Sequence, residues 1–599
     1  MLRLAIAQIH PTKGDYPANL DRIGGVLAQA ASLEPKVDVV LFPETATSGY
    51  FVEGGVREVA VSAGTLLRDL EARHRAAGSP PLDVAVGFYE LFENRFYNSC
   101  LYATLGSPSR VRHVHRKVFL PTYGVFDEGR FVEPGREVRA FDTAWGRAGI
   151  LICEDAWHSL TATLAALDGA QVILLPSASP ARGTGADERG TALPASAVRW
   201  ERTLRGIAEE HGVWVVYASL VGFEGGKGFA GGSLVVAPQG DVLVRGPLFE
   251  EAVITADLNL DEITRARADA PLLADLEARL PELAKTLSLS TRARRRRAVP
   301  FDPATNGGGP GSRRAEAPLR VVGQGVLDKD PLHLDVALAR RWLVSFLKDE
   351  VVKRRGFTKG VVGLSGGVDS SLTAALAVEA LGAENVIGVR LPYRTSSRES
   401  LDHAQLMIDR LGVTGVTIDI SEAVDAYVRA VGGADATRQG NVMARERMIA
   451  LFDLSAKHRA LPLGTGNKSE RLLGYFTWHA DDAPPVNPLG DLFKTQVWAL
   501  ARHVGIPDVI VEKPATADLI TGQTDEGDFG ISYPKADLIL HFLVLGLGPR
   551  EIVARGFTEA EVELVRRRLE STHWKRRLPT VAVMSQTAIG EFYLRPVDY

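Results

Sequence analysis

Three side chains in the first half of the sequence could together hydrolyse an amide. Cys153 ends the apolar stretch GILIC, Glu44 directly follows LFP, and Lys117 lies in the segment RKVFLP. A thiolate can attack an amide carbon, a carboxylate can take the thiol proton and later activate water, and an ammonium can stabilise the oxyanion. A cysteine at a strand-to-helix turn also feels the positive end of the helix, which favours the thiolate. The alternative is a cysteine that only fills core volume, and spacing alone does not decide between the two.

A second reaction centre is indicated by the segment GLSGGVDSS at residues 363–371, which follows an apolar stretch and precedes a helical one at residues 372–380. Its glycines let the backbone approach a ligand closely, and the N–H groups at the helix start can bind phosphate oxygens. Asp369 can ligate a magnesium ion that bridges phosphates. The sequence has no Walker A motif, and the segment resembles the loop of the N-type ATP pyrophosphatases, which adenylate a carboxyl or carbonyl oxygen. A purely structural turn is the alternative.

The composition excludes several classes of protein. The 599 residues, of which 45% are hydrophobic and 24% charged, predict an ordinary globular chain of several domains. No run of about 18 apolar residues occurs, so we expect no membrane span. Lys and Arg total 69 against 73 Asp and Glu, a balance that disfavours nucleic acid as a partner. The two cysteines exclude a disulfide scaffold and a Cys-rich zinc site, and they fit a reducing cytoplasm.

The elements that would position these residues follow from apolar runs. In the first half, buried strands are predicted at residues 37–42, 84–88, 149–153, 172–175 and 213–218, and helices at 19–32 and 195–211. Continuous apolar strands favour a sheet covered on both faces. In the second half, strands predicted at residues 360–364, 386–391 and 416–420 alternate with helical stretches. That alternation is typical of a doubly wound parallel sheet.

Residues 291–318 differ from their surroundings, because they are rich in Arg, Pro and Gly and nearly empty of large apolar side chains. Such a segment cannot bury enough surface to offset its ordering entropy, so it predicts a linker or a long exposed loop. Its five arginines between positions 292 and 297 could instead bind an anion or nucleic acid. The linker is favoured, since no other basic surface or aromatic stacking motif is evident.

The stretches LFPE, HRKVFLPTYGVFDEGR and GILICEDAWH closely resemble the nitrilase, or carbon–nitrogen hydrolase, superfamily over residues 1–265. The resemblance implies an αββα sandwich that dimerises sheet to sheet. It implies Glu44 as the general base, Lys117 as the oxyanion stabiliser and Cys153 as the nucleophile. In the glutamine-using branch it implies that Tyr123 and Ser179 bind glutamine. Arg182 is a candidate for the basic residue often found after this serine.

Segments of the second half occur in an order that closely resembles NAD synthetase over about residues 325–580: GLSGGVDSS, GNVMARERM, LGTGNKSE, GYFT, NPLGDLFK, PATADL, QTDEG and HWKRR. Two segments depart from that family, FTWHAD at residues 476–481, where the family has FTKYGD, and HWKRR at residues 573–577. Trp478 stands where the family has a basic residue, and Trp574 splits the usual His-Lys-Arg.

The resemblance assigns binding roles by position. Residues implied for ATP are Ser365, Gly366, Gly367, Val368, Asp369, Ser370, Leu391, Arg394, Thr465, Lys494 and Thr516. Residues implied for deamido-NAD are Asn441, Arg445, Glu470, Asp481 and Lys575, and the implied magnesium ligands are Asp369 and Glu470. Asn441 and Arg445, four apart on a predicted helix, would face one side of it.

Both halves together resemble the glutamine-dependent NAD synthetases. The implied domains are residues 1–265 (glutaminase), 266–322 (connecting helix and linker) and 323–599 (NAD synthetase). The implied reaction is the amidation of deamido-NAD with ATP, Mg²⁺ and glutamine-derived ammonia, through an acyl-adenylate, in a cytoplasmic homo-oligomer with an enclosed ammonia path. Alternatives are another glutamine-dependent adenylating amidotransferase, or an ammonia-only NAD synthetase with a different amidase activity. A binding protein with dead sites is disfavoured by the intact Cys153, Glu44, Lys117, Asp369 and Glu470.

Overall fold

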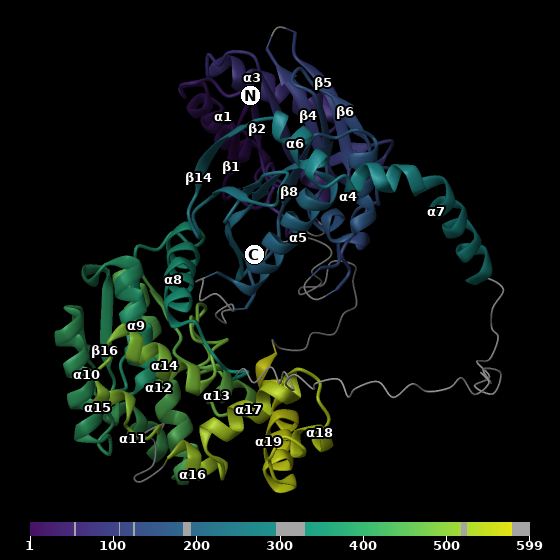
Figure 1. The fold of residues 1–599 in the computed structure, drawn as a ribbon. Helices are drawn as coiled ribbons and strands as arrows, with labels where there is room; N and C mark the ends of the chain where they lie inside the picture. Colours follow the sequence, from purple (N-terminus) through teal and green to yellow (C-terminus); the bar gives the residue numbers. More distant parts are fainter. Residues whose placement is uncertain are drawn as a thin grey trace, which may run out of the picture.

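The structure is a computed structural model that describes residues 1–52, 55–106, 108–123, 126–183, 193–294, 330–516 and 524–577. Two bodies are visible in Figure 1, one purple to teal and one green to yellow. The predicted linker, residues 291–318, lies outside the described residues except for its first four, which end helix α7 (Leu272–Arg294). Within the described part of the chain, no helix is long and apolar enough to cross a membrane.

Two six-stranded sheets face each other in the N-terminal body. The first has the order β14-β1-β2-β3-β4-β5, with β1 (Leu2–Gln8), β2 (Val39–Leu41), β3 (Leu82–Phe92), β4 (Arg95–Leu105), β5 (Arg110–Arg116) and β14 (Ala252–Leu258). The second has the order β13-β12-β9-β8-β7-β6, with β6 (Ala140–Asp142), β7 (Arg147–Ile150), β8 (Val172–Ser177), β9 (Trp214–Ser219), β12 (Leu234–Val236) and β13 (Val242–Arg245). Buried side chains of both sheets, among them Ile6, Leu41, Ile150 and Val215, form one core between them.

Helices cover the outer faces of both sheets. On the first sheet, α1 (Tyr16–Ala31) and α3 (Ala63–Ala76) contribute Ile23, Leu66 and other apolar side chains to a second core. On the second sheet, α4 (Ser159–Leu167) and α5 (Ala195–His211) pack through Ala165 and Leu204. The predicted αββα sandwich is confirmed, and inner strands such as β2, β8 and β9 are buried along their whole length because both of their faces are covered.

The C-terminal body contains the predicted parallel sheet, in the order β17-β16-β15-β18. Its strands are β15 (Lys359–Gly363), β16 (Val386–Arg390), β17 (Thr414–Thr417) and β18 (Ala460–Pro462). One face is covered by α8 (Val336–Leu347), α9 (Val368–Leu381), α10 (Arg398–Leu411) and α14 (Lys494–Val504), and the other by α11 (Ser421–Ala430) and α12 (Ala436–His458). Because β17 spans Thr414–Thr417, the strand predicted at residues 416–420 was misplaced by about two residues.

A helical layer completes this body, with α13 (Lys468–Leu473), α16 (Asp525–Phe529), α17 (Tyr533–Val544), α18 (Pro549–Val553) and α19 (Glu559–Ser571). These helices share a core that includes Phe529, Tyr533 and Val562.

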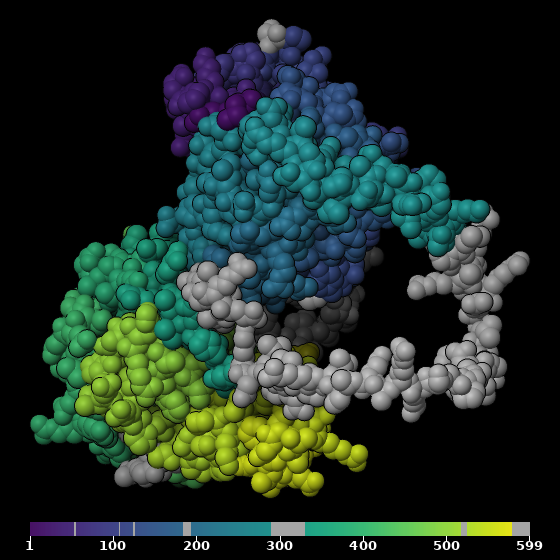
Figure 2. Space-filling model, in the orientation of Figure 1, coloured from purple at the N-terminus to yellow at the C-terminus, as the bar shows by residue number. Residues whose placement is uncertain are grey.

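The two bodies meet at the hairpin of β10 (Val221–Glu224) and β11 (Lys227–Ala230). Helix α8 and the π-helix that follows it (Lys348–Lys353) pack beside this hairpin. Phe223 contacts Phe346 and Phe249 contacts Trp342, with ring centroids 5.5 and 5.7 Å apart. Figure 2 shows the green surface of the second body against the blue and teal surface of the first. The phosphate-loop body is thus packed directly on the sandwich.

Candidate active sites

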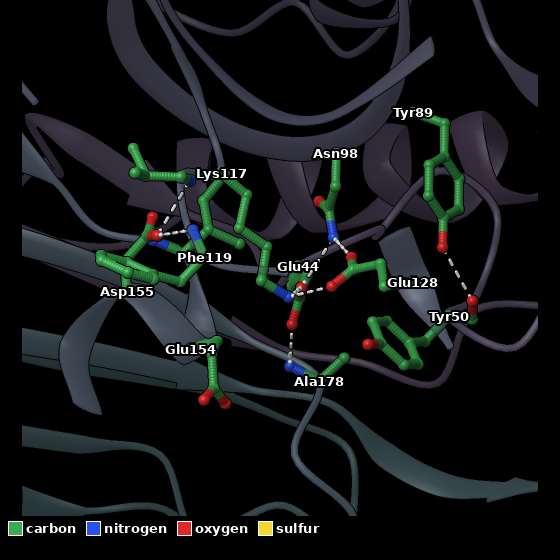
Figure 3. Close-up of polar contacts among 12 residues, drawn as sticks. Glu44, Tyr50, Tyr89, Asn98, Lys117, Phe119, Glu128, Glu154, Asp155 and Ala178 are labelled. Atoms are coloured by element: carbon green, nitrogen blue, oxygen red, sulfur yellow. Dashed lines mark hydrogen bonds and ion pairs between the residues drawn. The ribbon is translucent and has the colours of Figure 1, made fainter. Parts of the chain in front are cut away.

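The first candidate site is a buried group of charges between the two sheets of the sandwich (Figure 3). Lys117 Nζ lies 2.7 Å from Glu44 Oε1 and 2.7 Å from Glu128 Oε2, and both Glu44 and Lys117 are fully buried. Asn98 Nδ2 donates to Glu44 Oε1 at 2.8 Å and also to Glu128. The backbone N–H of Ala178 donates to Glu44 Oε2 at 2.6 Å. The structure thus brings the predicted Glu44 and Lys117 together and adds Glu128 and Asn98, which sequence reasoning missed.

Burial and proximity control the protonation of this group. Burial alone would lower the pKa of the Lys117 ammonium, but Glu128 and Glu44 outweigh it and raise that pKa. Lys117 is therefore a permanent cation, as an oxyanion stabiliser must be. Burial also raises the pKa of Glu128, against the lowering effect of Lys117.

Cys153 begins a short 3-10 helix (Cys153–Trp157) rather than ending a strand, because β7 stops at Ile150. Its φ is 45°, a left-handed conformation that is strained for a residue other than glycine. Burial and, next, Glu44 raise the pKa of its thiol, although Lys117 acts in the opposite direction. Burial and Glu44 therefore act against the effect expected of a helix end, and the thiol needs a base to deprotonate it.

The side chains predicted to bind glutamine lie at the rim of this site. Tyr123 is 58% exposed, and its hydroxyl donates to Glu154 Oε2 at 2.8 Å. Ser179 is partly buried and directly follows Ala178, whose N–H binds Glu44. Arg182 is exposed, and its backbone N–H donates to Ser196 Oγ. An aromatic wall that sequence reasoning missed includes Tyr50, whose ring centroid lies 5.7 Å from Lys117 Nζ.

The second candidate site is a cavity of about 470 Å³ at the carboxyl edge of the parallel sheet. Twelve of the side chains and loop residues predicted for this site line it: Ser365, Gly367, Val368, Asp369, Ser370, Leu391, Thr465, Glu470, Asp481, Lys494, Thr516 and Lys575. This edge, where a phosphate loop joins β15 to α9, is where ligands bind in open α/β sheets.

Four predicted residues do not line the cavity. Gly366 has φ 76°, and a Cβ there would lie 2.1 Å from Ser400 O, so its role is to shape the loop. Arg394 forms an ion pair with Asp425. Asn441 accepts a hydrogen bond from Thr477 Oγ1 at 3.2 Å, and Arg445 Nη2 donates to Trp478 O at 3.2 Å. Asn441 and Arg445 therefore contact the segment at residues 477–478, of which Thr477 lines the cavity.

The phosphate loop is closed by its serines. Ser365 Oγ lies 3.1 Å from Ser370 Oγ, and Ser370 Oγ donates to Gly367 O at 3.1 Å. The loop thereby directs the N-terminal end of the 14-residue helix α9 at the cavity. A helix N-terminus presents N–H groups and positive potential, which suit a phosphate.

Beside the loop, Lys494 lies between two carboxylates. Its Nζ is 2.5 Å from Asp369 Oδ2 and 3.6 Å from Glu470 Oε1, and its side chain is 2% exposed. Burial and, next, Asp369 raise the pKa of Glu470 to about 8. Asp525, also missed from sequence, lines the same cavity, and Tyr533 donates to its Oδ2 at 2.8 Å.

These carboxylates fit a magnesium ion. Both Asp369 and Glu470 offer the hard oxygen ligands that Mg²⁺ prefers, and both line the phosphate cavity. The described residues hold no cluster of three or more His, Cys, Asp and Glu side chains placed for a metal. Mg²⁺ characteristically takes one or two carboxylates and completes its shell with phosphates and water.

Comparisons with known proteins agree with this geometry. The carbon–nitrogen hydrolase family model matches residues 3–268, and the NAD synthase family model matches residues 340–579. The glutamine-dependent NAD(+) synthetase of Thermotoga maritima is 32% identical over 614 residues, covering 100% of this chain and 98% of that protein. The NH(3)-dependent NAD(+) synthetase of Chlorobaculum parvum is 44% identical over 265 residues, covering 44% of this chain and 95% of that protein.

A solved structure is similar over both bodies. The glutamine-dependent NAD+ synthetase from Acinetobacter baumannii, in complex with ADP, has a TM-score of 0.66 at 26% identity, covering 98% of this chain and 96% of that chain. The fold and the two sites define a carbon–nitrogen hydrolase domain joined to an NAD synthase domain. The chain belongs to the glutamine-dependent NAD(+) synthetase family, which confirms the resemblance noted in the sequence.

Proposed function

We propose that this chain converts deamido-NAD to NAD, using ATP and ammonia released from glutamine, and yields AMP, pyrophosphate and glutamate. The observation that carries the proposal is that one chain holds both a buried Cys–Glu–Lys group and a phosphate-loop cavity, in a family that uses both. A carboxylate is a poor electrophile at neutral pH, so its amidation requires activation, which adenylation supplies.

In the proposed glutaminase reaction, Cys153 Sγ attacks the side-chain amide carbon of glutamine while the thiol proton passes to Glu44. Lys117 has three N–H donors, of which two are taken by Glu44 and Glu128, so the third is available to the oxyanion. The leaving ammonia takes the proton from Glu44 and a glutamyl thioester remains. Glu44 then draws a proton from water, which attacks the thioester. Glutamate is released as the C–S bond breaks, and the Cys153 sulfur takes the proton back from Glu44.

In the proposed synthetase reaction, the nicotinate carboxylate attacks the α-phosphorus of ATP and pyrophosphate leaves. Ammonia then attacks the acyl carbon and AMP leaves. The loop around Ser365 and Gly367 and the N-terminus of α9 would hold the phosphates, and Lys494, now paired with Asp369, would neutralise part of their charge. A magnesium ion held by Asp369 and Glu470 would supply further charge neutralisation on the phosphates.

Isotope labelling tests the whole proposal. The purified chain is given deamido-NAD, ATP, magnesium and glutamine labelled with ¹⁵N in its amide, and the products are analysed by mass spectrometry. We expect ¹⁵N in NAD, with AMP, pyrophosphate and glutamate in equal amounts. In a second reaction, ¹⁵N-ammonium replaces the labelled glutamine. If ¹⁵N enters NAD from ammonium but not from glutamine, an ammonia-only synthetase with a separate amidase activity is favoured. Amidation of another carboxylate in its place would favour a different adenylating amidotransferase.

Three further expectations are part of the proposal. The domain boundaries at residues 265 and 323 can be tested by expressing the two parts separately. A homo-oligomer can be tested by light scattering of the purified chain. A cytoplasmic location is supported by the two cysteines, Cys100 and Cys153, which are both buried and unpaired, and can be tested by cell fractionation.

A further inference from the structure

The carboxylate of Asp155 joins the two backbone segments that carry Lys117 and Cys153. Its Oδ1 accepts hydrogen bonds from the N–H groups of Val118 and Phe119, both at 2.9 Å (Figure 3). Its Oδ2 accepts from the N–H of Ile152 at 3.0 Å. Val118 follows Lys117 directly, and Ile152 precedes Cys153 directly. One side chain therefore fixes the backbone within one residue of both groups.

A buried histidine orients this carboxylate. His115 Nε2 lies 2.9 Å from Asp155 Oδ2, and both side chains are almost fully buried. A carboxylate only accepts hydrogen bonds, so this contact places a proton on Nε2. His115 lies on β5, two residues before Lys117, so it also ties Asp155 to the strand that leads into the site.

Asp155 cannot itself carry protons for the reaction. A carboxylate has about four acceptor positions, and here three backbone N–H groups and one imidazole occupy them. Asp155 is also fully buried. Its influence on the reaction must therefore pass through the residues that it holds.

The backbone strain at Cys153 explains why the hydrogen bonds of Asp155 matter for the position of the thiol. A residue other than glycine keeps a φ of 45° only when its surroundings over-determine it. The hydrogen bond from Ile152 N–H to Asp155 fixes the peptide between Leu151 and Ile152, which is one peptide before the bond to Cys153. Without it, Cys153 can relax and its sulfur can move relative to Lys117 and Glu44.

We infer that Asp155, oriented by His115, is a positioning residue of the glutaminase site: it sets the place of the Cys153 thiol relative to Lys117 and Glu44. The inference rests on the proposed glutaminase reaction. It predicts that a change at Asp155 affects the chemical step with glutamine and leaves the synthetase site in the other body unaffected.

The test is the substitution Asp155→Asn. An amide presents a donor where one oxygen now accepts two hydrogen bonds, so at least one of the joined segments is released. We expect kcat for glutamine hydrolysis to fall about 100-fold, the size of effect that a misplacement of about 1 Å produces. KM for glutamine should stay near its wild-type value, and NAD formation from ammonium should be unchanged.

A second readout separates positioning from a general loss of structure. The rate at which iodoacetamide alkylates Cys153 is measured against pH, with Cys153→Ala as the blank. The profile of Asp155→Asn should shift, because the distances from the thiol to Lys117 and Glu44 set its protonation. Asp168→Asn is the matched control: Asp168 accepts the N–H of Ala140 at 2.9 Å in the same sandwich but joins no part of the site. It should keep the wild-type kcat and profile.

The outcomes are distinct. A wild-type chain that does not hydrolyse glutamine contradicts the proposed function itself. A folded Asp155→Asn variant with wild-type kcat and wild-type alkylation profile overturns the inference about Asp155. If this variant does not fold, His115→Gln, which keeps an N–H donor, is compared with His115→Phe, which has none. The phenylalanine variant should lose about tenfold or more in kcat relative to the glutamine variant, and equal rates would overturn the inference.

Discussion

The indole rings of Trp478 and Trp574 pack edge to face, with centroids 5.3 Å apart and planes at 87°. Each of them lies in one of the two segments at which the sequence departs from the NAD synthetase pattern. Their sequence neighbours Thr477 and Lys575 line the phosphate-loop cavity. Lys575 Nζ also donates to the carbonyl oxygens of Gly474 and Phe476, both at 2.9 Å. The contact between Trp478 and Trp574 therefore joins two segments that both contribute a residue to the lining of the cavity.

The first prediction is that these tryptophans act as a pair. Trp478→Ala and Trp574→Ala should each raise KM for deamido-NAD by roughly two- to tenfold, the equivalent of about 0.5–1.5 kcal/mol for an aromatic pair. The double variant should be little worse than either single variant, because the contact is lost only once. Steady-state kinetics with ammonium as the nitrogen source measure all three. Additive effects would contradict the pairing, and Trp145→Ala, in the sandwich, should leave this KM unchanged.

Adjacent glycines of the phosphate loop give a second, matched prediction. At Gly366, φ is 76° and a Cβ would lie 2.1 Å from Ser400 O, so Gly366→Ala should lower the free energy of unfolding by at least about 1–3 kcal/mol. At Gly367, φ is −95° and the nearest atom to a Cβ is Ser365 Oγ at 3.3 Å. Gly367→Ala should therefore keep stability but weaken ATP binding, since it adds a methyl group facing the phosphates. Urea unfolding and ATP titration distinguish the two, and equal loss of stability would contradict the assignment.

Local sequence pattern predicted strands that are buried on both faces, such as β2, β8 and β9. It missed β5, in which only His115 is buried. It misplaced β17, an edge strand with three of its four residues exposed, because the apolar run beside it marked the wrong residues. Strand ends were also uncertain, and residues 149–153 were predicted as strand although Cys153 begins a 3-10 helix.

The residues missed at the sites depend on contacts between distant segments. Glu128 lies in the segment FDEGR, whose polar residues are typical of a solvent-exposed turn. Only the packing of this turn against Asn98 and Lys117 buries it. Asp525 is similar, because its burial comes from Tyr533 and the surrounding helices. No local signal reports such burial.

The third prediction concerns pH and Glu470. Its pKa is raised to about 8, so between about pH 4.5 and 8 the folded protein holds a proton that the unfolded chain has released. The stabilisation of the folded state that comes from binding this proton more tightly is complete below about pH 4.5. It is lost as the pH rises through about 8. Glu470→Gln cannot ionise, so without nucleotide and magnesium its stability relative to wild type should increase from pH 5 to pH 8.

Urea unfolding of both proteins at the two pH values measures this difference. Glu379→Gln, at an exposed pair with Arg340, is the control and should follow the wild-type pH dependence. If the wild type and Glu470→Gln lose stability in parallel, Glu470 is not the group that titrates.

The fourth prediction separates the two chemistries. Cys153→Ala removes the nucleophile for the glutamine amide, and neither Glu44 nor Lys117 can replace a thiol in forming a thioester. The phosphate loop, Lys494 and Glu470 lie in the other body and are untouched. The variant should make no NAD from glutamine but should make NAD from ammonium, increasingly so at higher pH, because free ammonia is the nucleophile. The substitution removes little volume and should cost about 1 kcal/mol of stability or less.

Paired assays of NAD formation with each nitrogen source test this prediction, with circular dichroism as the folding control. NAD formation from glutamine by the variant would contradict the role of Cys153, and loss of both activities in a folded variant would mean that the bodies are coupled through more than shared ammonia.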